Sequence, residues 1–144
     1  MPRFAIVGAG HAGLQLALGL LAEGFEVTLV SNRTAEEIAS GNVLSSQCMF
    51  ESALQTERAL ELNLWEGECL PVEGISLVVP DGAGGKGIDW AARLDWPAQS
   101  VDQRLKVPAW MKLFIDRGGA LAIEEADVDD LERLAREHDL VVVA

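Results

Sequence analysis

The stretch Gly8-Ala9-Gly10-His11-Ala12-Gly13 constrains the fold of this chain more than any other. Apolar, β-prone residues 4–7 precede it, Leu- and Ala-rich residues 14–21 follow it, and a second apolar run covers residues 27–30. A strand, a glycine-rich turn, a helix and a second strand in this order form the opening βαβ unit of a dinucleotide-binding fold. The pattern therefore predicts an α/β fold with a parallel central sheet.

Each glycine of this turn has its own physical role. Gly8 lets the chain turn sharply out of the first strand, and Gly13 lets the helix pack closely on the sheet. Gly10 has no side chain, so a pyrophosphate can approach the backbone there. An anion is stabilised at a helix N-terminus because the first N–H groups lack partners within the helix and the dipole is positive there. The stretch thus predicts dinucleotide contacts from Gly8, Gly10, His11, Ala12 and Gly13.

The 144 residues carry a formal net charge of −12. The length predicts a single domain over residues 1–144, and 49% hydrophobic with 24% charged residues is an ordinary globular composition. The negative charge repels phosphate backbones and anionic lipid surfaces, which argues against nucleic-acid and membrane partners. We therefore expect a cytoplasmic protein with a small-molecule ligand.

Two cysteines, Cys48 and Cys69, form no Cys-x-x-Cys pair and have no histidine-rich neighbourhood. Neither a zinc site nor a redox dithiol fits that spacing, so we expect two reduced thiols in the core and no metal. The apolar residues 14–22 are too few to cross a bilayer.

The end of the second strand is where an acidic residue usually accepts hydrogen bonds from the adenosine ribose. Here Ser31, Asn32 and Arg33 stand in that place, which weakens a plain NAD assignment. Ser31 and Arg33 could receive a ribose 2′-phosphate, as in NADP-binding proteins. Arg33 could equally contact the ribose or phosphates of FAD, or be a solvated turn residue.

The remaining chain alternates helical and β patterns. Thr34 and Glu37 form a capping-box pattern that predicts a short helix. Two β-rich runs around a flexible glycine-rich turn predict an antiparallel insertion over about residues 75–96. The other predicted elements are a surface helix over 48–60, a helix from Asp102 to about Arg117, a strand over 120–123, a helix over 128–138 and a buried parallel strand over 140–143. Pro108 is expected to kink its helix or to mark a separate first turn.

With these elements in place, the chain resembles the N-terminal part of the styrene and indole monooxygenase family, the oxygenase components of two-component flavoprotein systems. Three stretches support the resemblance: residues 6–14; residues 55–65; and Val101-Asp102-Gln103-Arg104-Leu105 with Pro108, Met111 and residues 117–119. The closing residues 139–144 also match. The glycine motif is common to many flavoproteins, whereas Asp-x-Arg-Leu with its downstream proline is more particular.

The resemblance implies an FAD-dependent monooxygenase with a Rossmann-like fold. In that family an NADH-dependent reductase supplies reduced FAD by diffusion, and one oxygen passes from a C4a-peroxyflavin to an alkene or aromatic such as styrene or indole. It implies a small apolar aromatic substrate, leaves room for a homodimer, and identifies no acid or base, so the catalytic residues are unknown.

Further cofactor contacts follow from the resemblance. Arg104 is expected to reach the FAD phosphates or ribose, since its guanidinium fork suits two oxygens. The loop over residues 42–47, with Asn42 and Ser45, is expected beside the flavin; many family members carry an arginine where Asn42 stands. Ala126 is also expected to contact the cofactor.

Family members are about three times longer, so we expect an incomplete domain that holds the ADP half of FAD without a substrate domain. Two other functions remain open from the residues. One is an NADPH-dependent dehydrogenase domain, suggested by Ser31, Asn32 and Arg33. The other is a non-catalytic dinucleotide-binding module.

Overall fold

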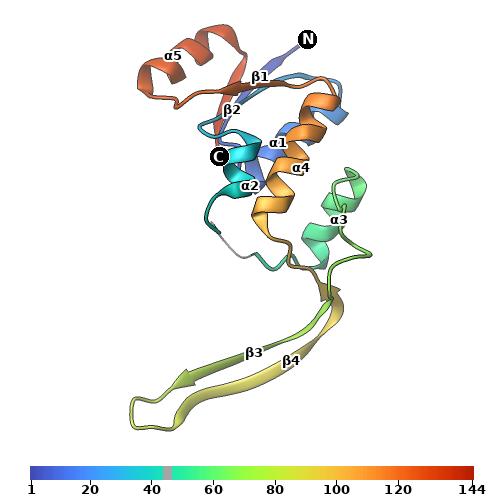
Figure 1. Ribbon diagram of the computed structural model, residues 1–144, viewed down its shortest axis with the longest axis vertical. Helices are drawn as coiled ribbons and strands as arrows, with labels where there is room; N and C mark the ends of the chain where they lie inside the picture. The colour runs from blue at the N-terminus through green and yellow to red at the C-terminus, as the bar shows by residue number, and fades with distance from the viewer. Residues whose placement is uncertain (44–46) are drawn as a thin grey trace. The chain divides into compact units, whose positions relative to one another are not determined.

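The computed structural model describes residues 1–43 and 47–144. The chain divides into two compact units, Met1–Ser45 with Asp102–Ala144, and Ser46–Val101. We call them the nucleotide unit and the hairpin unit (Figure 1).

The nucleotide unit alternates strands and helices as the sequence predicts. Its strands are β1 (Arg3–Val7), β2 (Glu26–Ser31), β5 (Ala120–Ile123) and β6 (Leu140–Val143). Its helices are α1 (His11–Ala22), α2 (Ala35–Ser40), α4 (Gln103–Asp116) and α5 (Val128–Glu137). The four strands form one sheet in the order β5-β2-β1-β6, and all three neighbouring pairs are parallel. The predicted α/β fold with a parallel sheet is confirmed.

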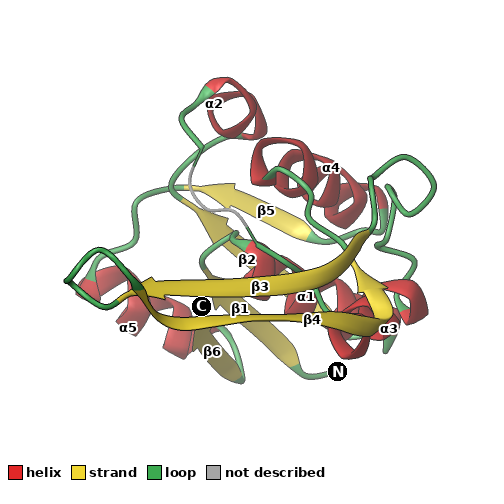
Figure 2. Ribbon diagram, turned by 90° about the horizontal axis from the view of Figure 1, so that it is seen from below, coloured by secondary structure: helices red, strands yellow, loops and turns green. Residues whose placement is uncertain are grey.

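Helices cover both faces of this sheet (Figure 2). On one face Ala5, Val30 and Leu134 form a buried cluster that joins β1 and β2 to α5. On the other face α1 contacts β1 and β2, and α4 packs beside α1 and contacts β5. Leu14 and Leu18 of α1 are fully buried, because a helix that contacts both a sheet and another helix exposes little of its apolar surface.

The glycine turn fixes how closely α1 approaches β1. Gly8 has a φ of +118°, which a residue with a side chain rarely adopts. A Cβ on Gly13 would collide with the carbonyl oxygen of Gly8, and a Cβ on Gly8 would collide with that of Ala144. Both glycines therefore serve backbone packing, as predicted for a sharp turn followed by a closely packed helix.

The hairpin unit contains α3 (Glu51–Ala59) and the antiparallel strands β3 (Val72–Pro80) and β4 (Lys86–Ala98). The predicted antiparallel insertion is confirmed, and both strands extend beyond the predicted ends. The helix expected over residues 48–60 begins only at Glu51. Its expected start is wrong because the backbone of Met49 pairs with Gln99 in an isolated antiparallel bridge, which keeps this stretch extended.

Three further expectations need correction. Pro108 lies inside one continuous helix, so a separate first turn is wrong. The strand β6 is parallel but not buried: Leu140 is 50% and Val143 68% exposed, because β6 has one neighbour in the sheet. Both cysteines are free thiols, but neither lies in the core, since Cys48 is exposed and Cys69 half-buried beside the carbonyl of Ser100.

Substituting Gly13 tests the packing of α1. Gly13→Ala is expected to destabilise the protein by about 1–3 kcal/mol, since the added methyl must push the helix off the turn. The matched control is Gly10→Ala, because a Cβ at Gly10 meets nothing within 4 Å. Urea unfolding of both variants measures the difference, and equal stabilities would contradict the close packing.

Asp102 offers a pH-dependent test of α4. Its carboxylate caps the helix by accepting from the Arg104 backbone N–H at 2.8 Å and pairs with the Arg104 guanidinium at 2.6 Å. The side-chain hydrogen bond from Arg104, followed by the backbone one, holds the pKa of Asp102 below its ordinary value of 3.8. A lowered folded-state pKa contributes stability above the unfolded pKa that is lost as pH falls through the folded one.

The variant Asp102→Asn keeps a capping side chain and removes the charge. At pH 7 it should unfold at lower urea than wild type, and the two proteins should converge as the pH falls through the lowered folded-state pKa of Asp102, where the wild-type carboxylate becomes protonated. Urea midpoints from pH 2 to pH 7 measure this. A midpoint difference that stays constant with pH would show that the Asp102–Arg104 ion pair contributes nothing.

Candidate functional site

The carboxyl ends of the parallel strands meet at one edge of the sheet, and the turns that follow them are tied together there. Gly8 N–H donates to the Val30 carbonyl at 2.9 Å, and Glu124 N–H donates to the Ser31 carbonyl at 2.9 Å. These bonds hold the exits of β1, β2 and β5 side by side. In open α/β sheets ligands bind at this edge.

The N-terminus of α1 lies at this edge and differs from the other helix starts in the unit. Thr34, Asp102 and Asp127 cap α2, α4 and α5 through side-chain oxygens. The helix α1 begins at Gly10, where the described residues provide no side-chain cap. No described side chain therefore compensates its positive end through a cap, and the space beside Gly10 is open.

A buried cation lies close to this helix start. The ring of His11 meets that of Trp110 edge-on, with centroids 4.8 Å apart, and Lys106 Nζ lies 4.8 Å from the Trp110 ring centroid. Lys106 is only 1% exposed. The sequence prediction included His11 but missed Lys106 and Trp110; their spacing of four along α4, which puts them on one face, was the available signal.

The exit of β2 is a compact local turn. Ser31 is buried. Its hydroxyl donates to the Arg33 carbonyl at 2.7 Å and accepts from the Arg33 N–H at 3.2 Å. The hydroxyl is thus used to shape the turn. Asn32 is exposed and Arg33 half-buried, and Arg33 forms no ion pair with any described residue. The edge therefore offers one arginine next to the glycine turn.

The loop after β5 brings the backbone of an acidic residue, Glu124, beside Ser31. Glu124 follows Ile123, which pairs with Ser31 across the sheet, and its carboxylate lies 2.9 Å from Arg133 of α5. Ala126, in the same loop, packs against the buried cluster of Ala5, Val30 and Leu134. Sequence reasoning missed Glu124, because only the pairing of β2 with β5 brings it beside Ser31.

The remaining predicted residues have a different status. Arg104 is in the nucleotide unit, but its Nε and Nη2 atoms already donate to Asp102. That bond raises the pKa of Arg104 further, so it stays a cation whose fork is engaged by its own helix cap. Asn42 is exposed after α2. Ser45 lies outside the described residues. A contact of these three with a cofactor stays a prediction.

The edge therefore combines an open helix N-terminus and a half-buried arginine. This is the chemistry of an anion site that suits a pyrophosphate. Within residues 1–43 and 47–144 no three His, Cys, Asp or Glu side chains gather as metal ligands do. None of the described helices is both long and apolar enough to span a membrane.

Comparison with known proteins gives two relatives of the whole chain. No protein-family model matches it. Styrene monooxygenase StyA of Pseudomonas fluorescens and that of another Pseudomonas are each 33% identical over 141 residues, or 98% of this chain. The match covers 33% of each relative, so the chain spans about a third of their length.

Solved structures with the same fold are also found. A 2-methyl-3-hydroxypyridine-5-carboxylic acid oxygenase aligns over 85% of this chain and 31% of its own, with a TM-score of 0.61 and 15% identity. The flavin-dependent brominase Bmp2 aligns over 85% and 29%, with a TM-score of 0.64 and 14% identity. At such identities these matches establish the fold alone. The chain is therefore similar to styrene monooxygenase StyA over a third of that protein's length.

Proposed function

We propose that this chain is the FAD-binding part of a flavin-dependent monooxygenase and holds the ADP half of FAD at the carboxyl edge of its parallel sheet. The observation that supports this most is the uncapped start of α1 at Gly10, with open space where a side chain would stand. The 33% identity with StyA over 98% of the chain supports the choice of a flavin enzyme.

The residues at the edge fit the proposed group. The pyrophosphate would lie against the backbone of Gly10, His11, Ala12 and Gly13, where N–H groups and the helix dipole stabilise two negative charges. Arg33 would reach the ribose or a phosphate from the end of β2. Bound FAD would supply the oxygen-transfer chemistry, which side chains alone cannot perform. The protein's part is to bind and orient the nucleotide half.

A monooxygenase of this kind needs further parts. We propose a small apolar aromatic substrate such as styrene or indole, and a cytoplasmic NADH-dependent flavin reductase as the source of reduced flavin. Both proposals rest on the relatives alone, because the matched third contains the nucleotide edge and no identified acid or base. A homodimer stays a prediction.

The turn after β2 keeps a second candidate open. Ser31, Asn32 and Arg33 replace the acid that usually accepts from the ribose of NAD, and Arg33 is half-buried at the end of β2. An arginine in this place could hold the 2′-phosphate of NADPH. The residues alone therefore also support an NADPH-dependent dehydrogenase domain, which nucleotide titration separates from the FAD assignment.

Two substitutions at Gly10 test the anion site. Gly10→Val should weaken ADP and FAD binding by more than about tenfold, since its side chain would fill the space at the helix start. Gly10→Ser should also weaken binding while stabilising the protein, because the serine oxygen caps the N–H groups that a phosphate would use. Calorimetric titration gives affinities and urea unfolding gives stabilities. Unchanged nucleotide affinity in both variants would contradict the site.

Arg33→Ala distinguishes the two cofactors. If FAD is the ligand, wild type should bind FAD more tightly than NADPH, and the variant should keep the wild-type ratio of NADPH to NADH affinity. Fluorescence titration with FAD, NADPH and NADH measures all three. Preferred binding of NADPH that disappears in Arg33→Ala would instead establish the dehydrogenase candidate. The control substitution is Arg117→Ala. Arg117 lies at the opposite end of α4 from the Asp102 cap.

A further inference from the structure

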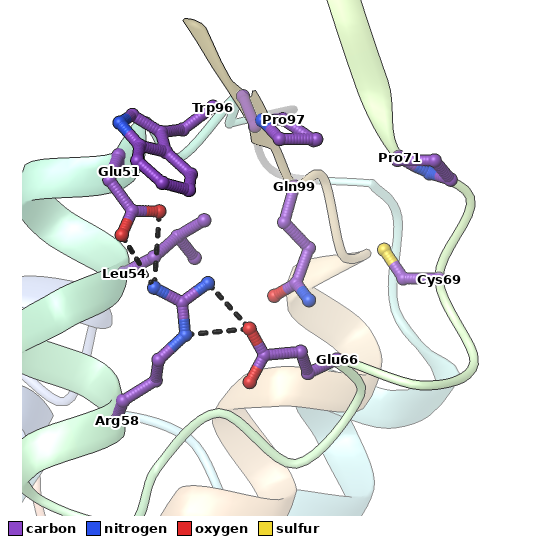
Figure 3. A pocket seen from close by; sticks show the side chains of 10 residues that line it. Glu51, Leu54, Arg58, Glu66, Cys69, Pro71, Trp96, Pro97 and Gln99 are labelled. Atoms are coloured by element: carbon purple, nitrogen blue, oxygen red, sulfur yellow. Dashed lines mark hydrogen bonds and ion pairs between the residues drawn. The ribbon is translucent and has the colours of Figure 1, made fainter.

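The hairpin unit contains a cavity that the proposed function does not use. It has a volume of about 400 Å³, within the range of small-molecule sites, and every lining residue belongs to this unit. Its walls come from α3, from the segment before β3, and from the end of β4 (Figure 3). None of the residues of the nucleotide edge lines it.

One polar side chain of the cavity has an unused acceptor. Gln99 is 6% exposed, and its Oε1 atom is buried without a hydrogen-bond partner among the described residues. Figure 3 shows the amide extending into the cavity toward Glu66. A buried carbonyl oxygen without a donor costs about 1–3 kcal/mol. A ligand that brings an N–H donor to this atom would recover that cost.

The charges around the cavity favour a cation. Arg58 lies between two carboxylates, 3.0 Å from Glu51 and with its Nε 2.6 Å from Glu66. One guanidinium facing two carboxylates leaves a net charge of about −1. Because both carboxylates already engage Arg58, the arginine is not available to hold an anionic ligand. The site therefore repels anions and attracts ammonium groups.

The remaining walls are apolar. Leu54 is buried at the base, and the indole of Trp96 lies beside Glu51 and Leu54 (Figure 3). Trp96 is 66% exposed, so its ring is accessible to a ligand. An indole next to unbalanced carboxylates suits a cation with an apolar body, since the face of the ring attracts positive charge.

We propose that this cavity binds a small organic ammonium compound, with its N–H donated to Gln99 Oε1, its charge compensated by the Glu51–Arg58–Glu66 cluster and its apolar body on Trp96. The proposal does not depend on the dinucleotide site, because it uses none of its residues. Binding is therefore measured without nucleotide, and its failure would leave the proposed function unaffected.

Three probes that differ in charge test the preference. They are 2-phenylethylamine, 2-phenylethanol and 3-phenylpropionate, titrated into the full 144-residue chain at pH 7. The amine should bind at least about fivefold more tightly than the alcohol, and the carboxylate more weakly than both. Amide shifts from NMR give the affinities and the location. No binding of any probe at millimolar concentration, or equal binding of all three, overturns the proposal.

Substitutions then assign the contacts. Glu66→Gln keeps the acceptor for Arg58 and should remove most of the preference for the amine, with little change for the alcohol. Gln99→Met and Trp96→Ala should each lower the affinity for the amine about fivefold or more. Trp90→Ala is the matched control, since Trp90 is exposed on β4 but does not line the cavity.

A preference for the amine that survives Glu66→Gln would contradict the assignment. So would an equal loss of amine affinity in Trp96→Ala and Trp90→Ala. Circular dichroism and urea unfolding confirm that each variant is folded. The conservative Glu66→Gln keeps the test decisive if Gln99→Met or Trp96→Ala loses stability.

Discussion

The contact between Gly13 of α1 and the carbonyl of Gly8 determines the geometry of the nucleotide unit. Without a side chain at either position, the helix approaches the end of β1 closely enough for its N-terminus to lie at the carboxyl edge of the sheet. Gly8 meanwhile takes a φ of +118° and donates to the carbonyl of Val30 in β2. One backbone contact thus orders the turn, aims the helix dipole and places the exit of β2 beside it.

The proposed anion site follows from that arrangement together with an asymmetry among the helices. The starts of α2, α4 and α5 are satisfied by Thr34, Asp102 and Asp127, so their N–H groups are engaged within the chain. The start of α1 is not capped by a described side chain. A nucleotide unit that caps its other three helix starts with side chains and leaves this one open favours an anionic ligand there.

Much of the fold could be predicted because its determinants are local. The glycine spacing, the alternating apolar runs and the Thr34 capping box each act over a few residues, and the structure places strands and helices accordingly. The exposure of β6 and the extended stretch at Met49 could not be predicted, because both depend on which strand lies next to which. A continuous apolar run does not reveal whether its strand has one neighbour or two.

The candidate site was only partly predictable for the same reason. The glycine turn and Ser31 could be found from spacing, whereas Glu124 and Lys106 come near the edge through sheet pairing and helix packing. Arg104 pairs with Asp102 at 2.6 Å, a bond that its motif did not indicate, and its contact with a cofactor phosphate or ribose stays a prediction. Motifs identify the type of chemistry, but the partner of each side chain depends on the tertiary structure.

The central claim is that the open start of α1 binds a pyrophosphate, and an NMR titration of the 144-residue chain with ADP tests it most directly. The account predicts the largest backbone amide shifts at Gly10, His11, Ala12 and Gly13, with smaller shifts at Ser31, Asn32 and Arg33. Saturating ADP that leaves the amides of this turn unchanged, or shifts only residues of the hairpin unit, would contradict it.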